Sequence, residues 1–136
     1  MRPFLITMGV LAVCVLAACE DDVKSLAPTP PGEGIVIFLN ADFAGPSQAL
    51  NIDVPDLARI EGACSGGGEG ETPSWSDCIS SVKVMSGWTA TLYRDKDYKG
   101  ASVTVTADTP SLRDLRGPCD NDSFNDCVSS IRIARQ

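Results

Sequence analysis

The stretch Asn125-Asp126-Cys127-Val128-Ser129-Ser130 decides the fold of this chain, because it recurs upstream as Ser76-Asp77-Cys78-Ile79-Ser80-Ser81. Each copy runs into an alternating segment, Val82-Lys83-Val84 or Ile131-Arg132-Ile133, and this alternation predicts a β-strand. Carboxylate, amide and hydroxyl oxygens therefore gather at the start of two rigid strands. Calcium prefers hard oxygen donors held in this way, so the two stretches indicate a pair of cation sites.

The two stretches belong to a longer internal repeat. One set of residues recurs at a constant spacing of 55 positions: Phe38 and Tyr93, Phe43 and Tyr98, Gly45 and Gly100, Ser47 and Ser102, Pro55 and Pro110, Cys64 and Cys119. The spacing shortens to 49 between Trp75 and Phe124, so the first repeat carries six extra residues, which we assign to 65–70. A repeat of this consistency indicates two copies of one structural unit.

Short alternating segments separated by turn residues predict an all-β chain with four short strands in each repeat. The first repeat spans residues 35–86 and the second 88–135. In the first repeat we expect strands at 35–40, 48–53 and 79–85, a turn at 41–46, a turn or short strand at 56–60, and a glycine-rich loop at 62–70. Neither repeat would bury its apolar face alone, so the two are expected to close face to face as a β-sandwich.

Four of the six cysteines lie within the repeats: Cys64, Cys78, Cys119 and Cys127. In a small exported domain, four cysteines indicate two disulfides with three possible connectivities. Since both cysteines of one repeat recur in the other, the simplest pairing joins Cys64 to Cys78 and Cys119 to Cys127, each stabilising by roughly 2.5 to 3 kcal/mol. A four-thiolate zinc site is the alternative, which the absence of any Cys-x-x-Cys pair disfavours.

The N-terminal segment predicts export and lipidation. Arg2 precedes an apolar run that ends in Leu16-Ala17-Ala18-Cys19, which resembles the lipobox of bacterial lipoproteins. We expect a signal peptide at 1–18, a lipidated Cys19 at the start of a flexible tether at 19–34, and a folded domain at 35–136. The protein is then expected outside the cytoplasm, anchored to the bacterial cell membrane or outer membrane. An ordinary secretory signal with an incidental Cys19 is the alternative.

Charge and composition exclude some classes of function. Removal of Arg2 with the signal peptide leaves ten basic and eighteen acidic residues, so the net charge falls from −7 to −8. Nucleic acid is therefore not an expected partner, because phosphate neutralisation needs clustered Lys and Arg. The chain has no histidine, which removes Ser-His and Cys-His nucleophile systems and the usual catalytic zinc ligands. We therefore expect no enzymatic activity.

The hairpin segments 38–45 and 93–100 resemble the aromatic-x4-aromatic-x-Gly signature of βγ-crystallin Greek keys. The stretches that open this section are similar to the calcium motif of the same family, in which two Asn/Asp positions are followed by two free positions, Ser/Thr and Ser. The resemblance covers residues 35–135. It implies two Greek-key motifs packed as a disulfide-stapled βγ-crystallin-like sandwich, with calcium ions bound in clamps shared between the repeats.

The resemblance also implies which residues bind the metal. Side-chain oxygens are expected from Asp77 and Ser80 in the first repeat and from Asp126 and Ser129 in the second. Backbone carbonyls at Leu39 and Arg94 are expected to complete the sites. The first motif position is Asn125 in one repeat, whereas Ser76 departs from the family pattern and should make its motif the weaker one. The final serines, Ser81 and Ser130, are expected to hydrogen-bond a turn instead.

The function these features favour is a membrane-tethered, calcium-binding structural module of the bacterial envelope. A crystallin-fold metalloprotease inhibitor is one alternative, with residues 62–72 as an exposed reactive segment. An envelope- or carbohydrate-binding module without calcium is another, through Trp75 and Trp88. Because Trp75 matches Phe124 in the repeat, however, we expect Trp75 in the core.

Overall fold

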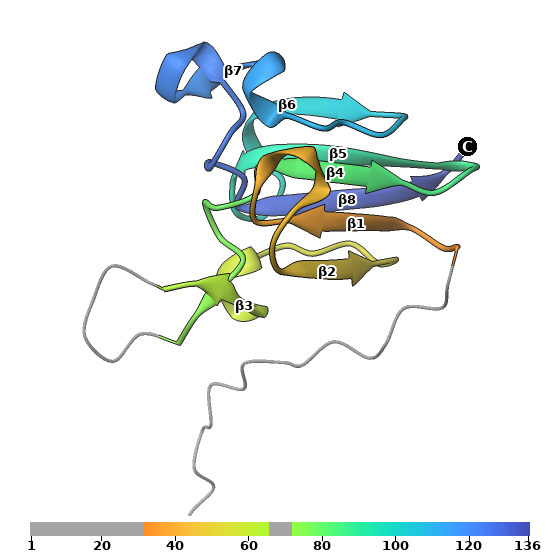
Figure 1. Cartoon of the computed structure of the whole chain (residues 1–136), viewed down its shortest axis with the longest axis horizontal. Helices are drawn as coiled ribbons and strands as arrows, with labels where there is room; N and C mark the ends of the chain where they lie inside the picture. The colour runs from red at the N-terminus through yellow and green to blue at the C-terminus, as the bar shows by residue number, and fades with distance from the viewer. Residues whose placement is uncertain (1–31, 66–71) are drawn as a thin grey trace, which may run out of the picture.

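The computed structural model describes residues 32–65 and 72–136 (Figure 1). The predicted signal peptide, the lipidation site at Cys19, most of the tether and nearly all of the six-residue insertion lie outside these ranges, so those predictions stay untested. In the described ranges, no helix has the length and apolar character that crossing a membrane requires.

Each repeat forms four strands, as the sequence predicted. The strands are β1 Ile35–Phe38, β2 Ser47–Leu50, β3 Glu61–Cys64, β4 Ser81–Val84, β5 Trp88–Asp95, β6 Lys99–Val105, β7 Arg116–Cys119 and β8 Ser130–Arg135. Short 3-10 helices lie between them: η1 Ala41–Phe43, η2 Leu57–Arg59, η3 Leu112–Asp114 and η4 Asp120–Asp122. The described chain is therefore all-β, with single helical turns only.

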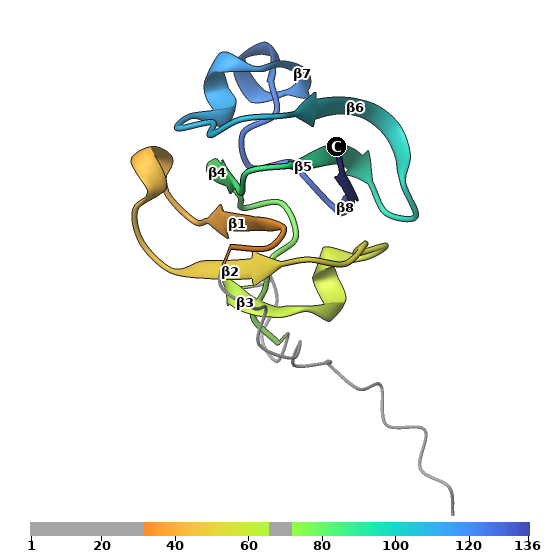
Figure 2. The same cartoon turned by 90° about the vertical axis from the view of Figure 1, so that its right-hand side faces the viewer.

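The strands form two antiparallel three-stranded sheets, one from each repeat. Their orders are β2-β1-β4 and β6-β5-β8. β3 and β7 lie outside the sheets and at opposite ends of the molecule (Figures 1 and 2). Each is held by isolated bridges to one later residue, Ser74 for β3 and Ser123 for β7.

The two repeats exchange backbone segments. The residue before each recurring proline, Pro55 or Pro110, leaves its own repeat and pairs with the last strand of the other. Val54 exchanges two hydrogen bonds with Ile131 at 2.8 and 2.9 Å, and Thr109 does the same with Val82 at 2.8 and 3.0 Å. This reciprocal crossing gives the Greek-key connection of each repeat and relates the two halves by an approximate two-fold symmetry.

A single apolar core lies between the sheets. Its fully buried side chains come from both repeats in matched positions, for example Leu57 with Leu112 and Trp75 with Phe124. Trp75 is 2% exposed, which confirms its predicted place in the core. Trp88 lies at the surface end of β5, with the Arg135 guanidinium 4.7 Å from its ring centroid. Neither tryptophan therefore offers a bare platform for a sugar ring.

The strand predicted at 79–85 is wrong at its start, because β4 begins at Ser81. The backbone of the two preceding residues bonds the other repeat instead: the Ile79 carbonyl accepts from the Asp126 amide, and the Ser80 carbonyl accepts from the Leu112 amide. The glycine-rich loop predicted at 62–70 is also wrong in part. Its first residues belong to β3, where the Gly62 amide donates to the Pro73 carbonyl at 3.1 Å.

Both predicted disulfides are present. Cys64 pairs with Cys78 and Cys119 with Cys127, at Cα–Cα distances of 6.3 and 6.2 Å, within the range usual for disulfides. Each bond joins the end of the outlying third strand of a repeat to the motif that precedes its last strand.

Candidate metal centre

The two motifs meet back to back at one end of the sandwich. The Asp77 amide donates to the Val128 carbonyl at 3.0 Å, and the Asp126 amide donates to the Ile79 carbonyl at 3.1 Å. Both aspartates adopt left-handed backbone conformations, with φ of 57° and 53°. Asp tolerates this region better than most residues, so the motif can turn sharply there and direct the carboxylate towards the other repeat.

The first candidate site, which we call the Ser80 cleft, takes its carboxylate from the second repeat. The Ser80 hydroxyl donates to Asp126 Oδ1 at 3.1 Å, although the two residues lie 46 positions apart. Ser80 itself is held on both sides, since its amide donates to the Phe38 carbonyl at 3.0 Å and its carbonyl accepts from the Leu112 amide. Six residues relevant here line the cleft: Leu39, Cys64, Cys78, Ser80, Asn125 and Asp126.

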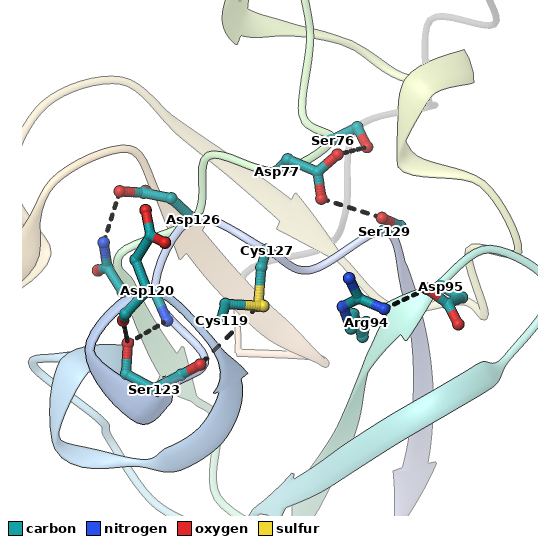
Figure 3. The surroundings of a disulfide bond; sticks show 11 residues. Ser76, Asp77, Arg94, Asp95, Cys119, Asp120, Ser123, Asp126, Cys127 and Ser129 are labelled. Atoms are coloured by element: carbon teal, nitrogen blue, oxygen red, sulfur yellow. Dashed lines mark hydrogen bonds and ion pairs between the residues drawn. A yellow bond between two sulfur atoms is a disulfide. The ribbon is translucent and has the colours of Figure 1, made fainter.

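The second candidate site, the Ser129 cleft, repeats this arrangement with the repeats exchanged (Figure 3). The Ser129 hydroxyl donates to Asp77 Oδ1 at 3.0 Å, and the Ser129 amide donates to the Tyr93 carbonyl at 2.9 Å. The residues that line it are Asp77, Arg94, Asp95, Cys119, Asp126, Cys127 and Ser129. The predicted side-chain ligands thus fall into two crossed pairs, which the repeat alone did not specify.

The first motif position holds the carboxylate in place. Ser76 Oγ donates to Asp77 Oδ2 at 3.1 Å, and Asn125 Nδ2 donates to Asp126 Oδ2 at 2.5 Å. Each aspartate therefore accepts from its own repeat on one oxygen and from the other repeat on the second. In this arrangement Ser76 and Asn125 orient the aspartates.

The predicted main-chain donors lie at equivalent places. Leu39 directly follows β1 and lines the Ser80 cleft, while Arg94 lines the Ser129 cleft. The register between β5 and β6 shifts between Tyr93 and Asp95, so Arg94 sits at a bulge. Bulges frequently lie beside functional sites because they redirect backbone groups out of the ladder.

The final serine of each motif does not face a cleft. Ser81 Oγ donates to the Asn40 carbonyl at 2.6 Å and accepts from the Phe43 amide at 3.0 Å. Ser130 does the same in the second repeat, with the Asp95 carbonyl at 2.6 Å and the Tyr98 amide at 3.0 Å. These hydroxyls tie the motif to the folded hairpin, as the sequence predicted.

The sequence did not predict the roles of some charged side chains in and around the clefts. Arg113, on η3, lines the Ser80 cleft, and the Arg94 side chain lies 3.7 Å from Asp95 Oδ1 beside the Ser129 cleft. Two other aspartates that motif reasoning did not single out hold the sheets together, since Asp53 accepts from the Ile133 amide at 2.8 Å and Asp108 from the Val84 amide at 2.9 Å.

The donor set of each cleft fits a calcium ion. A carboxylate, a serine hydroxyl and a main-chain segment converge there, and both aspartates are solvent-exposed, so an ion can reach them. Within residues 32–65 and 72–136, no group of three or more Asp, Glu, Cys or His side chains is placed to hold a metal. Soft ligands for zinc are therefore absent from these clefts, where the cysteine sulfurs are in disulfides.

Known proteins share both the fold and the sequence pattern. A βγ-crystallin domain from Flavobacterium johnsoniae superposes with a TM-score of 0.56 at 29% identity, over 75% of this chain and 94% of that one. The N-terminal domain of Protein S gives 0.54 at 30%, over 75% and 96%. A development-specific protein S homologue of Myxococcus xanthus is 34% identical over 99 residues, which are 73% of this chain but 46% of that relative. The chain thus spans about half the length of this curated relative.

These likenesses, with the two Greek keys and the paired disulfides, define a βγ-crystallin-like domain. The sequence profile of peptidase inhibitor family I36 matches residues 37–105. The chain belongs to peptidase inhibitor family I36.

Proposed function

We propose that this chain is a calcium-binding βγ-crystallin-like structural module tethered to the bacterial envelope. The observation that supports the proposal most strongly is the crossed pairing of the clefts, in which the carboxylate of one repeat meets the hydroxyl of the other. A bound calcium ion would supply, in each cleft, positive charge to a carboxylate and a common centre for its oxygen donors. Because each site needs oxygens from both repeats, binding would favour the packed state of the sandwich.

The donor set predicts modest affinity. In each cleft one carboxylate meets the serine, Asp77 at Ser129 and Asp126 at Ser80, whereas Asp95 beside the Ser129 cleft is paired with Arg94. Calcium affinity rises with the number of charged ligands. We therefore expect dissociation constants on the order of 10⁻⁴ to 10⁻³ M, as in extracellular calcium modules. At a hundred times the dissociation constant, one such site would stabilise the fold by about 2.7 kcal/mol.

Isothermal titration of calcium into the metal-stripped protein tests this function. The test variant is Asp77→Asn with Asp126→Asn, which removes two charges but keeps a side chain that tolerates left-handed backbone. The matched control is Asp42→Asn with Asp97→Asn, since these aspartates occupy equivalent places in the two repeats and have φ of 57° and 58°. Two-site heat is expected in the wild type and the control but not in the test variant. A wild type that gives no heat rejects calcium binding.

The tether is a separate part of the proposal and rests on the Leu-Ala-Ala-Cys sequence at 16–19. Replacing Cys19 by Ser should move the protein from the membrane fraction to the soluble fraction of exporting cells, without changing its calcium heat. Metabolic labelling with a fatty acid should mark the wild type and not Cys19→Ser. Unlabelled wild-type protein would contradict lipidation.

Membership of family I36 favours peptidase inhibition as a second candidate function. Two disulfides close surface segments of the fold, and a closed segment loses less conformational freedom when it is presented to a peptidase. A panel of metalloproteases assayed with a tenfold molar excess of the protein tests this candidate. Full activity of every peptidase in that excess would reject it for the classes assayed.

A further inference from the structure

The two disulfides lie inside the candidate metal centre, and the proposed calcium function has so far given them no role. We infer that they position the calcium ligands, so that calcium binding and disulfide formation are thermodynamically coupled. This inference rests on the proposed calcium function and makes the redox state of the two disulfides a regulator of the same sites.

The second cysteine of each bond stands between ligands of different clefts. Cys78 follows Asp77, which faces the Ser129 cleft, and precedes Ser80, which forms the other cleft. Cys127 likewise stands between Asp126 and Ser129. A bond that fixes either cysteine therefore restrains one ligand of each site.

The disulfides also form part of the cleft walls. Cys64 and Cys78 line the Ser80 cleft, and Cys119 and Cys127 line the Ser129 cleft. Figure 3 shows the second bond between the aspartate of one cleft and the serine of the other. In each cleft the serine and the disulfide come from one repeat, and the carboxylate that pairs with that serine comes from the other.

The third strands lie outside the sheets and pair with short segments of their own repeat. β3 pairs through isolated bridges with Ser74 and through the Gly62 amide with the Pro73 carbonyl, and β7 pairs through isolated bridges with Ser123. Each disulfide anchors the last residue of one of these strands, Cys64 or Cys119, to the motif. Breaking the bond would release one wall of a cleft while leaving both sheets paired.

The aspartates need such a restraint. A left-handed conformation is strained for a non-glycine residue, and it persists where the surroundings fix it. For Asp77 and Asp126 these surroundings are one crossing hydrogen bond from the amide, two hydrogen bonds accepted by the carboxylate, and the disulfide at the next residue.

Coupling between two equilibria is reciprocal. If a missing disulfide weakens calcium binding tenfold, saturating calcium makes that disulfide tenfold harder to reduce, which corresponds to a reduction potential about 30 mV more negative. In the reaction, dithiothreitol loses two electrons and two protons and closes to its cyclic disulfide, while the cystine gains them and becomes two cysteines.

Calcium titration of the full-length protein lacking one bond tests the first half of this coupling. The variants are Cys64→Ser with Cys78→Ser, and Cys119→Ser with Cys127→Ser. The control is Ile133→Ala, because Ile133 packs against the core and lines neither cleft, so it reports general destabilisation. We expect at least tenfold weaker binding at the cleft whose wall is lost and less than twofold change in the control. Binding within twofold of wild type in both cysteine variants would overturn the inference.

The reciprocal measurement uses the wild type and needs no variant to fold. The protein is equilibrated in dithiothreitol redox buffers with and without saturating calcium, and each disulfide is followed by alkylation and mass spectrometry. An equilibrium constant for reduction that falls tenfold in calcium supports the coupling. An unchanged constant, in a protein whose titration shows calcium heat, overturns the coupling and leaves the proposed calcium function standing. A wild type that gives no heat overturns the proposed function and the coupling together.

Discussion

At the scale of single residues, each motif divides its oxygens between two tasks. The aspartate and the penultimate serine, Ser80 or Ser129, face the clefts. The final serine, Ser81 or Ser130, is buried and bonds the backbone of the hairpin. The final serine is the first residue of β4 or β8, and the cleft-facing serine lies just before it in extended chain, where adjacent side chains point to opposite sides. Loss of the final serine should therefore affect stability and not the metal site.

Ser130→Ala should lower the free energy of unfolding by about 1–3 kcal/mol, since it leaves the Tyr98 amide and the Asp95 carbonyl without their partner. Urea denaturation measures the change. Thr104→Ala is the control, because Thr104 is exposed and bonds Thr91 across the sheet at 2.9 Å. A loss for Ser130→Ala no larger than that of Thr104→Ala would contradict the role of this hydroxyl.

Tyr98 gives a pH dependence at the alkaline end. Burial, and next the charge of Asp53, raise the pKa of Tyr98 above its ordinary value of 10.0, whereas the nearby Arg132 lowers it by less. The folded state then holds the phenol proton more tightly than the unfolded state. The contribution of Tyr98 to the free energy of unfolding is therefore fully present below pH 10 and lost as the pH rises through the folded pKa. The unfolding free energy should fall less steeply above pH 10 in Tyr98→Phe than in the wild type, and parallel curves would contradict this.

At the scale of elements, the hairpins and strand ends depend on left-handed backbone. In each folded hairpin an aspartate and an aromatic residue have positive φ, Asp42 with Phe43 and Asp97 with Tyr98. The ring centroids of Phe38 and Phe43 lie 5.7 Å apart, and those of Tyr93 and Tyr98 lie 5.9 Å apart. From the last strand of each repeat, Lys83 covers the Phe43 ring and Arg132 covers the Tyr98 ring. These packed hairpins bring the segments after β1 and β5 to the clefts.

Substitution of Gly34 tests how closely the backbones of β1 and β2 must approach at the end where β1 begins. Its φ is +72°, and a Cβ there would overlap the Leu50 carbonyl and lie 2.8 Å from the Asn51 Cα. Gly87 has a similar φ of +78° but open space around it, so Gly87→Ala reports backbone strain alone, about 1–2 kcal/mol. Gly34→Ala should cost about 1–3 kcal/mol more. Equal losses in thermal or urea unfolding would show that the overlap is relieved without cost.

The elements were predictable from the sequence to the extent that the repeat and the alternation carry them. Because Trp75 matches Phe124 in the repeat, its burial was predicted, and because both cysteines of a repeat recur, the disulfide pairing was predicted; the structure confirms both. The start of β4 and the strand β3 were not predicted, because hydrogen bonds with the other repeat decide the first and a hydrogen bond from the Gly62 amide to the Pro73 carbonyl helps to decide the second. The family resemblance implied clamps shared between the repeats, but the repeat alone could not say which aspartate meets which serine, since both aspartates and both serines occupy equivalent positions in it.

At the scale of the whole molecule, the two repeats depend on one another for backbone pairing, for the core and for the candidate metal ligands. Val54 and Thr109 complete the opposite repeat, and so do the amides of Asp77 and Asp126. A site shared in this way makes calcium binding a measure of how well the halves are assembled. It also predicts that one substitution in either repeat disables one site and spares the other.

The most direct test is calcium titration of four single variants: Asp126→Asn, Ser80→Ala, Asp77→Asn and Ser129→Ala. The crossed clefts predict that Asp126→Asn and Ser80→Ala each weaken calcium binding at the same site at least tenfold, and that Asp77→Asn and Ser129→Ala each do so at the other site. A double variant that combines Asp126→Asn with Ser80→Ala should then still bind calcium at one site. If instead Asp126→Asn and Ser129→Ala remove the same site, each repeat holds its own ion and the account of a shared metal centre is wrong.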